Sequence, residues 1–310
     1  EPSLKEEIVD NLWWLYRNAE FTSLRERAIK ILALIKPENY IDLLIKELED
    51  ENKKDNVRWS AAKALGMIGG EKAVKPLITA LERDEDGSVR GNVALALGRV
   101  GGEKAVKPLI TALERDEDGV VRGNAAVALG MIGGEKVVKP LITTLVKDKY
   151  YHVRGNVALA LGMIGGEKAI KPLITALAKD KAYGVRVNAA MALGVIGGEK
   201  AVESLIIALV KDKDDIVRLI AAVVLGRIGG EKAVEQLITT LTTDKNDFVR
   251  VSAAETLGRI GGEMAVEPLK STLKEKRKTL LGVKEKAFDA LEKICRRIGK
   301  RIPLETSKTK

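Results

Sequence analysis

The chain has 310 residues, 31% of them charged, with a formal net charge of +9, one Cys (Cys295) and one His (His152). No run of about 20 apolar residues is present, so we expect no membrane-spanning helix, and a single Cys excludes an internal disulfide. The first residues do not resemble a secretion signal. Together with the composition, this predicts a cytoplasmic, thermostable protein.

Residues 1–36 precede a regular pattern and predict an irregular helix hairpin, with helices over about 3–19 and 23–35. This segment is rich in aromatic side chains. The end units of a repeat stack must each cover one open face, so we interpret residues 1–36 as an N-terminal capping pair.

A tetrapeptide, Gly-Gly-Glu-Lys, then recurs at a constant interval of 32 residues, with Met in place of Lys in its last copy. The copies begin at residues 69, 101, 133, 165, 197, 229 and 261. A fixed period of this size is typical of a solenoid, in which each unit packs only on its neighbours. Proteins of this kind act through the long surface that stacking creates.

Residues 37–260 predict seven copies of one helix pair, which residues 69–100 illustrate. Apolar residues follow helical spacing over about 71–83 and again over about 87–100. Asp and Gly residues between these segments supply a turn and an N-cap. No segment has the pattern of a strand. We therefore predict an all-α fold, a right-handed α-solenoid (superhelix) of stacked antiparallel helix pairs.

The Gly-Gly-Glu-Lys motif itself allows two interpretations, a phosphate-binding loop or a helix stop. A phosphate loop requires a preceding strand and a Gly-Lys-Ser/Thr order, and the sequence has neither. We expect the first Gly of each pair, such as Gly101, to end the second helix in the left-handed conformation.

Residues 261–299 predict a longer, basic capping pair, and residues 300–310 a flexible tail. From residue 270 onward there are 14 Lys and Arg against 5 Asp and Glu, a net of +9, so the preceding residues are neutral overall. A solvated cap is the expected role of this charge. Binding to nucleic acid or to an anionic membrane is the alternative.

In each repeat an Asp precedes an Arg by six residues. The pairs are Asp84 and Arg90, Asp116 and Arg122, Asp148 and Arg154, Asp180 and Arg186, Asp212 and Arg218, and Asp244 and Arg250. Together with Val-Arg, Ala-Leu-Gly and Gly-Gly at constant spacings, this pattern resembles HEAT repeats, most closely the short HEAT-like repeats of the phycobilisome-lyase (E-Z) type. The resemblance implies that these side chains form a ladder of hydrogen bonds between neighbouring repeats. A phosphate-binding stripe is less favoured, because each Arg has an acid at a suitable spacing.

The resemblance also implies that the second helix of each pair lines the concave side. On a helical wheel, Gly91, Leu95, Gly98 and Arg99 point away from the buried stripe. The matching positions of other repeats are mostly apolar, which a free surface normally avoids. We predict a partner-binding groove lined by Trp59, Met67, Leu95, Val127, Met131, Tyr151, His152, Leu159, Met163, Tyr183, Met191, Val223 and Phe248.

The same positions allow a different interpretation, because curvature could pack these side chains together as a second core. Glycines at 91, 123 and 155 lie in mid-helix, which indicates room for the close approach of a bulky partner. An Asn follows each of these glycines, at residues 92, 124 and 156. We expect these Asn side chains to form hydrogen bonds between adjacent helices and not to a bound peptide.

Little in the sequence favours catalysis. Deoxyhypusine hydroxylases, built on the same repeats, need several His-Glu pairs for their metal, whereas His152 stands alone. Cys295 is expected to be buried and inert, and neither a zinc site nor a Cys-His pair can be assembled. We predict a non-enzymatic scaffold without metal or cofactor, whose partner is another protein or a peptide. A nucleic-acid-associated protein that uses the basic C-terminal segment and an engineered repeat binder are the alternatives.

Overall fold

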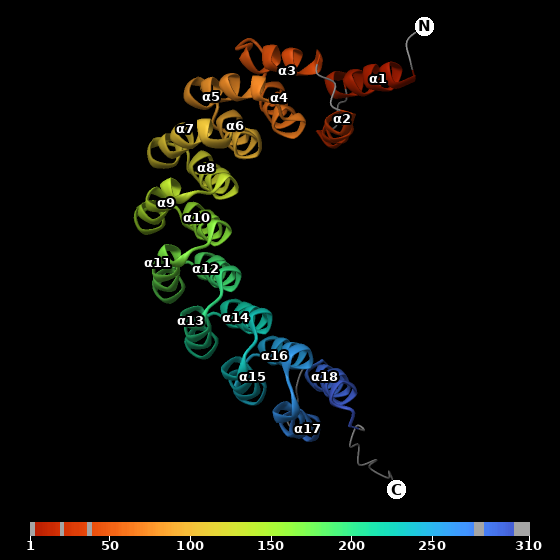
Figure 1. Cartoon of the computed structure of the whole chain (residues 1–310), viewed down its shortest axis with the longest axis vertical. Helices are drawn as coiled ribbons and strands as arrows, with labels where there is room; N and C mark the ends of the chain where they lie inside the picture. Colours follow the sequence, from red (N-terminus) through yellow and green to blue (C-terminus); the bar gives the residue numbers. More distant parts are fainter. Residues whose placement is uncertain (1–3, 19–21, 36–38, 276–281, 301–310) are drawn as a thin grey trace. The chain divides into compact units, whose positions relative to one another are not determined.

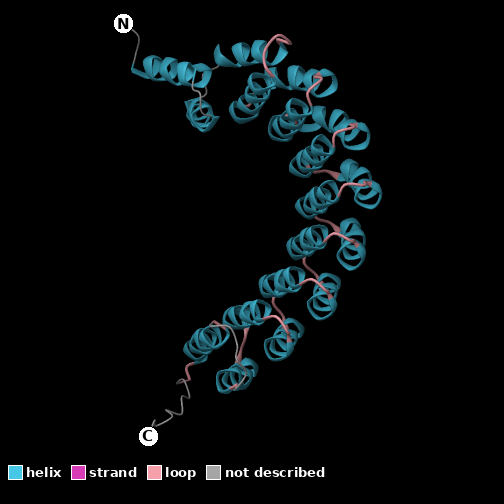
Figure 2. Cartoon of the chain, turned by 180° about the vertical axis from the view of Figure 1, so that it is seen from behind, coloured by secondary structure: helices cyan, strands magenta, loops and turns pink. Residues whose placement is uncertain are grey.

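The computed structural model describes residues 4–18, 22–35, 39–275 and 282–300, and these form helices joined by loops, without strands (Figures 1 and 2). The chain divides into two compact units, residues 1–164 (unit 1) and 165–310 (unit 2). In each unit, helices pair in an antiparallel manner and the pairs stack on one another. The odd-numbered helices form one layer and the even-numbered helices form the other (Figure 1). The predicted all-α solenoid of helix pairs is confirmed.

The helix bounds follow the 32-residue period closely. Unit 1 contains α1 (Leu4–Asn18), α2 (Thr22–Ile35), α3 (Asn39–Glu49), α4 (Asp55–Ile68), the short 3₁₀ helix η1 (Glu71–Ala73), α5 (Val74–Arg83), α6 (Gly87–Val100), α7 (Gly102–Arg115), α8 (Gly119–Ile132), α9 (Glu135–Lys147) and α10 (Tyr151–Ile164). Unit 2 contains α11 (Glu167–Lys179), α12 (Tyr183–Ile196), α13 (Glu199–Lys211), α14 (Asp215–Ile228), α15 (Glu231–Thr243), α16 (Asp247–Ile260), η2 (Glu263–Ala265), α17 (Val266–Lys274) and α18 (Val283–Ile298). None of the helices in these two sets is long and apolar enough to cross a membrane.

The predicted N-caps lie where the second helix of a pair begins. The Asp86 carboxylate accepts hydrogen bonds from the backbone N–H groups of Ser88 and Val89, and Asn246 caps α16 in the same way. At α12 this position is Ala182, which offers no side-chain cap. The caps satisfy N–H groups that a helix leaves unpaired in its first turn.

The glycine pairs adopt a backbone conformation other than the expected one. Gly133 has φ 74° and ψ −162°, and Gly134 has φ 93° and ψ 157°. This extended region with positive φ is open essentially to Gly alone, and it differs from the left-handed helical region. Gly101 has φ −80°, and α7 begins directly after it. The prediction of a left-handed cap is therefore wrong. The pair is required because most of these turns need positive φ at two successive residues.

Glycine also brings neighbouring even-numbered helices close together. A Cβ built on Gly98 would lie 2.7 Å from the Cα of Ala128, and one built on Gly130 would lie 2.8 Å from the Cα of Ala160. Gly98 therefore faces the next helix and not solvent, contrary to the helical wheel. The odd-numbered helices contact one another less extensively. Within unit 1 the even-numbered helices accordingly lie on the inner side of the bend (Figure 1).

Unit 2 departs from this Gly-Ala contact at two junctions. Val224 and Thr256 replace the Ala, and their methyl groups lie 2.2 Å from a Cβ built on Gly194 and on Gly226, respectively. The branched side chains occupy the space beside the glycines, and these helices contact each other less extensively than α6 and α8 do. Where Ala290 restores the small residue, α16 and α18 pack closely again.

Parts of the predicted end units fall outside the residues that the structure describes. These parts are residues 1–3, 19–21 and 36 of the N-terminal pair, residues 276–281 of the C-terminal pair and residues 301–310 of the tail. Trp13, in α1, is buried, and its ring centroid lies 4.9 Å from that of Tyr40. At the other end, the Lys300 ammonium bonds to the Glu263 carboxylate.

The Gly-Ala contact generates a first prediction. Gly98→Ala should destabilise the chain by about 1–3 kcal/mol, because its methyl group meets backbone of the next helix. Gly184→Ala is the matched control: it is also a helical Gly-to-Ala change, but a Cβ there meets nothing within 4 Å. It should leave stability unchanged or raise it by up to about 1 kcal/mol. Urea unfolding followed by circular dichroism measures both, and equal midpoints would contradict the contact's role.

Candidate functional site

A ladder of Arg and Asp side chains joins successive repeats near the turn between the two helices of each pair. Arg90 donates from Nε and Nη2 to the two carboxylate oxygens of Asp116 in the next repeat, at 2.8 and 3.0 Å. The same guanidinium donates from Nη1 to the backbone carbonyl of Asp84 in its own repeat, at 2.8 Å. Arg90 thus takes its carboxylate from the following repeat, and only a carbonyl from the Asp six residues earlier.

The same two-point contact recurs inside each unit. The remaining pairs are Arg58 with Asp84 and Arg122 with Asp148 in unit 1, and Arg186 with Asp212 and Arg218 with Asp244 in unit 2. Arg154 donates to the carbonyls of Asp148 and Lys149, and Asp180 accepts from the N–H of Ala182. Guanidinium groups that are paired and buried or half-buried are poorly placed to hold a phosphate, so the geometry does not favour a phosphate-binding stripe.

The ladder ends differently at the C-terminal pair. Arg250 is fully buried, and its Nε donates to the carbonyl of Leu241 at 2.7 Å. Its carboxylate partners are Glu275, near the end of α17, and Asp247, in its own helix. The predicted pairing of Arg250 with Asp244 is absent from the contacts that the structure gives, because the Arg250 side chain turns toward these other acceptors.

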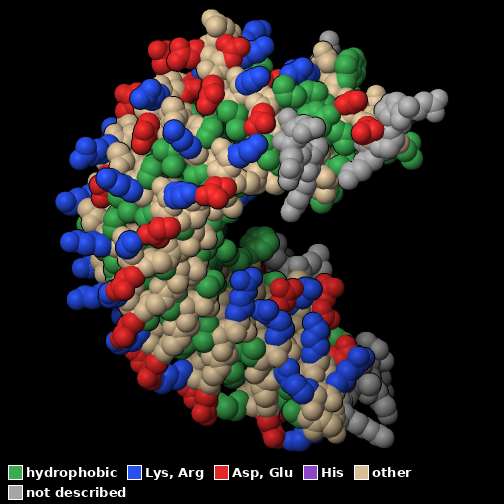
Figure 3. All heavy atoms as spheres, turned by 45° about the horizontal axis from the view of Figure 1, so that its top comes forward, with side chains coloured by type: hydrophobic (Ala, Val, Ile, Leu, Met, Phe, Trp, Pro, Cys, Tyr) green, Lys and Arg blue, Asp and Glu red, His purple; other side chains and the backbone are tan. Residues whose placement is uncertain are grey.

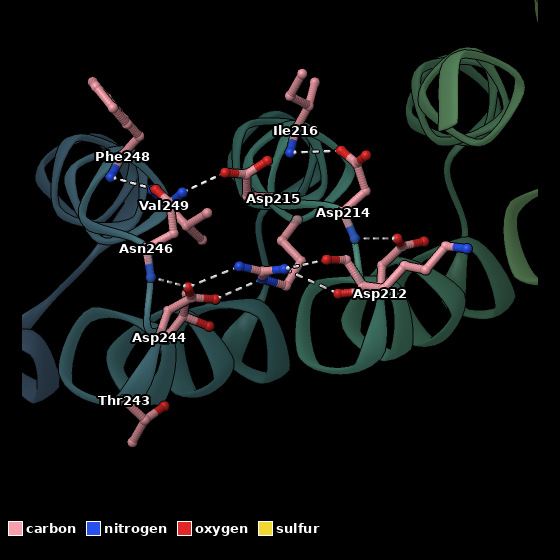
Figure 4. Close-up of polar contacts among 12 residues, drawn as sticks. Asp212, Asp214, Asp215, Ile216, Thr243, Asp244, Asn246, Phe248 and Val249 are labelled. Carbon is pink, nitrogen blue, oxygen red and sulfur yellow. Dashed lines mark hydrogen bonds and ion pairs between the residues drawn. The ribbon is translucent and has the colours of Figure 1, made fainter. Parts of the chain in front are cut away.

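Ladder carboxylates also shape the turns. Asp244 accepts from Arg218 and from the N–H of Asn246, which in turn caps α16 (Figure 4). In the same view Ile216 and Phe248 point together to the side away from Asp244 (Figure 4). One turn therefore fixes the contact between repeats and also presents an apolar side chain to solvent.

The contact between Asp148 and Arg122 shifts the pKa of both groups. Burial alone would raise its pKa, but hydrogen bonds from Arg122 and from the N–H of Tyr150 hold the pKa of this carboxyl below its ordinary value. The hydrogen bond to Asp148 likewise raises the pKa of Arg122. Both groups stay charged near neutral pH, as a strong two-point ion pair requires.

The Glu and Lys of the recurring tetrapeptide form a second, exposed series of ion pairs. Lys104 lies 2.5 Å from Glu71 of the preceding repeat, Lys136 lies 2.6 Å from Glu103, and Lys232 lies 2.9 Å from Glu199. This series was not predicted, although the sequence shows a constant spacing of 33 residues between the acid and the base. Exposed pairs of this kind contribute little to stability.

The predicted groove residues of unit 1 lie on the solvent side of the even-numbered helices. We call this surface the even-helix face of unit 1; it comprises the exposed and half-buried residues of α4, α6, α8 and α10. Leu95, Val127 and Leu159 are half-buried, as are Trp59 and Met67. Met131 is 41% exposed and Met163 is 54% exposed. None of these side chains is sealed in a second core.

The mid-helix glycines of this face serve the chain itself. The Asn124 side chain donates to the carbonyl of Gly91 at 3.0 Å, and its nitrogen lies 3.1 Å from a Cβ built on Gly91. Asn156 fills the space beside Gly123 in the same manner, at 2.9 Å. The expectation of room for a bulky partner beside these two glycines is therefore wrong. The bond between adjacent helices is confirmed for Asn124, whereas Asn92 bonds to Ser88 in its own helix.

Aromatic residues gather at the rim of this face, where α10 begins. Tyr151 is 62% exposed, and its ring centroid lies 5.8 Å from that of His152, which is also exposed. The ring centroid of Tyr150 lies 5.4 Å from that of His152. Gly119 permits this arrangement, because a Cβ there would lie 2.9 Å from the imidazole Nε2. Tyr151 and His152 belong to the predicted groove, whereas Tyr150 was not among the predicted groove residues.

Unit 2 has its own even-helix face, formed by α12, α14, α16 and α18. Tyr183, Met191 and Phe248 are exposed, and Val223 is half-buried. Val223 borders a hollow of about 300 Å³ whose other walls are mainly charged, among them Glu255, Arg259, Lys286, Asp289 and Lys293. The predicted groove is therefore lined mainly by charged residues, and not by apolar ones, near α16 and α18.

The cations of the C-terminal pair make contacts within the chain. Arg297 donates to the carbonyls of Arg259 and Gly261, and Lys284 donates to that of Glu275. Three further cations have carboxylate partners, namely Glu255 and Asp289 for Lys286, Glu292 for Arg296 and Glu263 for Lys300. Residues 276–281, which include three of the basic residues, lie outside the described part of the chain.

Other chemistry is sparse in the residues that the structure describes. No group of three or more His, Cys, Asp or Glu among them could hold a metal ion, and Cys295 is buried. A hollow of about 270 Å³ between α11 and α13, bordered by Ile174 and Ile207, was not anticipated. Its only sequence signal is an apolar residue, Ile207, on the outward side of α13.

The family of the chain follows from its repeats. A model of HEAT repeats matches residues 9–98, 74–153, 138–224 and 202–292. The chain belongs to the HEAT-repeat family. The resemblance drawn from the sequence is thereby confirmed. No curated protein matches the sequence.

Solved structures show the same fold at low sequence identity. Kap95p, from a structure of its complex with RanGDP, is 14% identical over 94% of this chain and 45% of its own, with a TM-score of 0.64. Escherichia coli YibA is 21% identical over 94% of this chain and 98% of its own, with a TM-score of 0.54. The CpcE–CpcF phycocyanin lyase of Nostoc is 25% identical over 82% of this chain and 94% of its own, with a TM-score of 0.48.

The ladder generates a second prediction. Asp148→Asn should cost about 3–5 kcal/mol at neutral pH, because it leaves the buried Arg122 guanidinium without its counter-charge. The folded pKa of Asp148 is depressed, so its contribution is fully present above the unfolded pKa and is lost as pH falls through the folded pKa. The gap in stability between parent and variant should therefore begin to narrow below about pH 4.

Thermal unfolding from pH 7 to pH 3 measures this gap. Glu103→Gln, in the exposed pair with Lys136, is the control and should cost no more than about 1 kcal/mol. A gap that stays constant down to pH 3 would show that the Asp148 charge is not what stabilises the junction.

Proposed function

We propose that this HEAT-repeat chain is a non-enzymatic scaffold that binds another protein or a peptide on its even-helix faces. The observation that carries the proposal is the row of Leu95, Val127 and Leu159, which stays open to solvent in unit 1 beside Met131 and Met163. Exposed apolar side chains that lie contiguously are typical of interaction sites. Met and Leu surfaces also adapt readily to apolar partners.

Binding accounts for these side chains better than solubility or stability does. The buried stripe of each even-numbered helix already supplies the core, as with Val93 and Leu97 in α6, which are both fully buried. Polar residues at 95, 127 and 159 would leave that core intact. The apolar character of the row is therefore best explained by a partner that covers it.

The rival in which the basic C-terminal segment binds nucleic acid is less well supported. The described cations of α18 largely pair with carboxylates or carbonyls of the same chain, and a nucleic acid would have to compete with these contacts. Within unit 1, the half-buried row of Leu95, Val127 and Leu159 is apolar, whereas phosphate contacts require cations.

A third prediction tests the proposal. Replacing Leu95, Val127 and Leu159 together with Ser should leave the Tm within a few degrees of the parent, because these side chains are only half-buried. It should also abolish capture of a partner. The measurement uses immobilised parent and variant chains in extract from the source cells, with bound proteins identified by mass spectrometry.

The matched control replaces three exposed apolar residues of the odd-numbered helices, Val146, Ile207 and Val210, with Ser. This variant should capture the same partners as the parent. If the first variant unfolds, the three residues belong to the core and the proposal fails. If both variants capture equally, the binding surface lies elsewhere.

A further inference from the structure

We infer that the partner of unit 1 is an amphipathic α-helix with acidic residues beside its apolar stripe, lying across α6, α8 and α10. The inference rests on the proposed function and adds the conformation and the charge of the partner. Three observations on the even-helix face of unit 1 support it. They are the hydrogen bonds that its Asn side chains already make, the spacing of its apolar rows and the absence of carboxylates from α6, α8 and α10.

The even-helix face of unit 1 favours a partner whose backbone groups are already hydrogen-bonded to one another. An extended peptide needs donors and acceptors on the surface that receives it, whereas a helix satisfies its own N–H and C=O groups. The polar side chains between the apolar rows are the Asn residues. Asn92 bonds to the carbonyl of Ser88, and Asn124 bonds to that of Gly91. These amide groups are thus held by the chain itself.

The spacing of the rows fits a helix better than a strand. Leu95, Val127 and Leu159 occupy one position on successive even-numbered helices, and helices that pack side by side lie about 8–10 Å apart. A partner helix that runs along the stack advances about 10.5 Å in seven residues. At the middle of that range, about 9 Å, the heptad exceeds the separation of the rows by about 1.5 Å. The face repeat of an extended chain, about 6.6 Å, falls short of it by about 2.4 Å.

Charge is one-sided on the part of this face formed by α6, α8 and α10, whereas α4 carries Asp55 in its first turn. Helices α6, α8 and α10 contain no Asp or Glu, whereas the odd-numbered α5, α7 and α9 carry Glu82, Glu103, Glu114 and Glu135. Figure 3 shows acidic and basic side chains mixed along the odd-numbered helices. Arg99, one turn after Leu95, is exposed and has no hydrogen bond or ion pair with any residue that the structure describes. An acidic flank on the partner would find a cation and no repelling carboxylate.

The test uses synthetic peptides of about 21 residues, or three heptads, with a fluorescent label. The Glu peptide has Leu at the apolar heptad positions and Glu beside them. In the Lys peptide each Glu is replaced by Lys, and in the Pro peptide two central solvent-side residues are replaced by Pro to prevent a helix. Fluorescence anisotropy measures Kd for the full chain at low and high salt.

We expect the Glu peptide to bind at least ten-fold more tightly than the Lys and Pro peptides. The triple Ser variant should weaken its binding at least ten-fold. Arg99→Glu should weaken it roughly 2- to 5-fold at low salt, less at high salt, as for an exposed ion pair. Arg115→Glu is the matched control, an exposed Arg in the last turn of α7, and should change Kd little.

The outcomes separate the conformation, the charge and the site. Equal binding of the Pro peptide would overturn the helical partner, and equal or tighter binding of the Lys peptide would overturn the acidic one; both leave the proposed function standing. Failure of all three peptides, when extract capture still depends on Leu95, Val127 and Leu159, overturns this inference alone. Peptide binding that ignores the triple Ser variant overturns it too and removes support for the site. A labelled single-stranded oligonucleotide that binds the parent chain but not Arg99→Glu would identify a nucleic acid ligand instead.

Discussion

Neighbouring repeats within each unit are joined by an Arg that bridges two turns at once. The guanidinium gives one N–H to a carbonyl of its own repeat and two to the carboxylate of the next, as Arg122 does with Asp116 and Asp148. A planar fork with fixed donors can do this, whereas an ammonium group acts as a single point charge. Because Asp148 also receives the N–H of Tyr150, the rung fixes the turn from which the next even-numbered helix starts. The direction of each even-numbered helix, and so the orientation of its outer side chains, depends on this contact.

The even-helix face is a product of close packing beneath it. Gly98 and Gly130 let the neighbouring helices touch through Ala, and Asn124 fills the space beside Gly91. Small residues and hydrogen-bonded Asn side chains therefore fill the space between neighbouring helices. The remaining outward positions take little part in the packing of one helix on the next. This division explains how residues 95, 127 and 159 can be apolar and open while the framework around them repeats almost unchanged.

Much of this architecture was predictable because the period multiplies a weak local signal. The helix bounds of α5 and α6, the N-cap at Asp86 and the absence of strands follow from patterns that recur many times. The Gly-Gly conformation was not predictable, because left-handed and extended positive-φ backbones both require Gly and differ only in ψ. The wheel placed Gly91 and Gly98 on the free side, because a wheel contains one helix and these two residues contact the next.

The candidate site divides in the same way. Which residues are apolar could be read from the sequence, and so could the acid-to-base spacing of the exposed pairs. The engagement of Asn124 with Gly91, the cluster of Tyr150 with His152, and the charged end of the face at Lys286 all depend on contacts between repeats. Such contacts reflect the geometry of stacking and leave no local trace.

The C-terminal pair uses the ladder without extending it. Val283 and Lys284 stand where Val249 and Arg250 stand one pair earlier, and Lys284 keeps the bond to a carbonyl of its own pair. Its ammonium group lacks the planar, forked donors with which an Arg also binds the carboxylate of the following repeat. Arg250 meanwhile takes Glu275, from that same pair. A duplicated internal repeat would bring both the Arg and the Asp that these contacts between repeats need. A repeat appended after α18 would meet Lys284 in place of the Arg, and so would lack the two-point contact to its Asp.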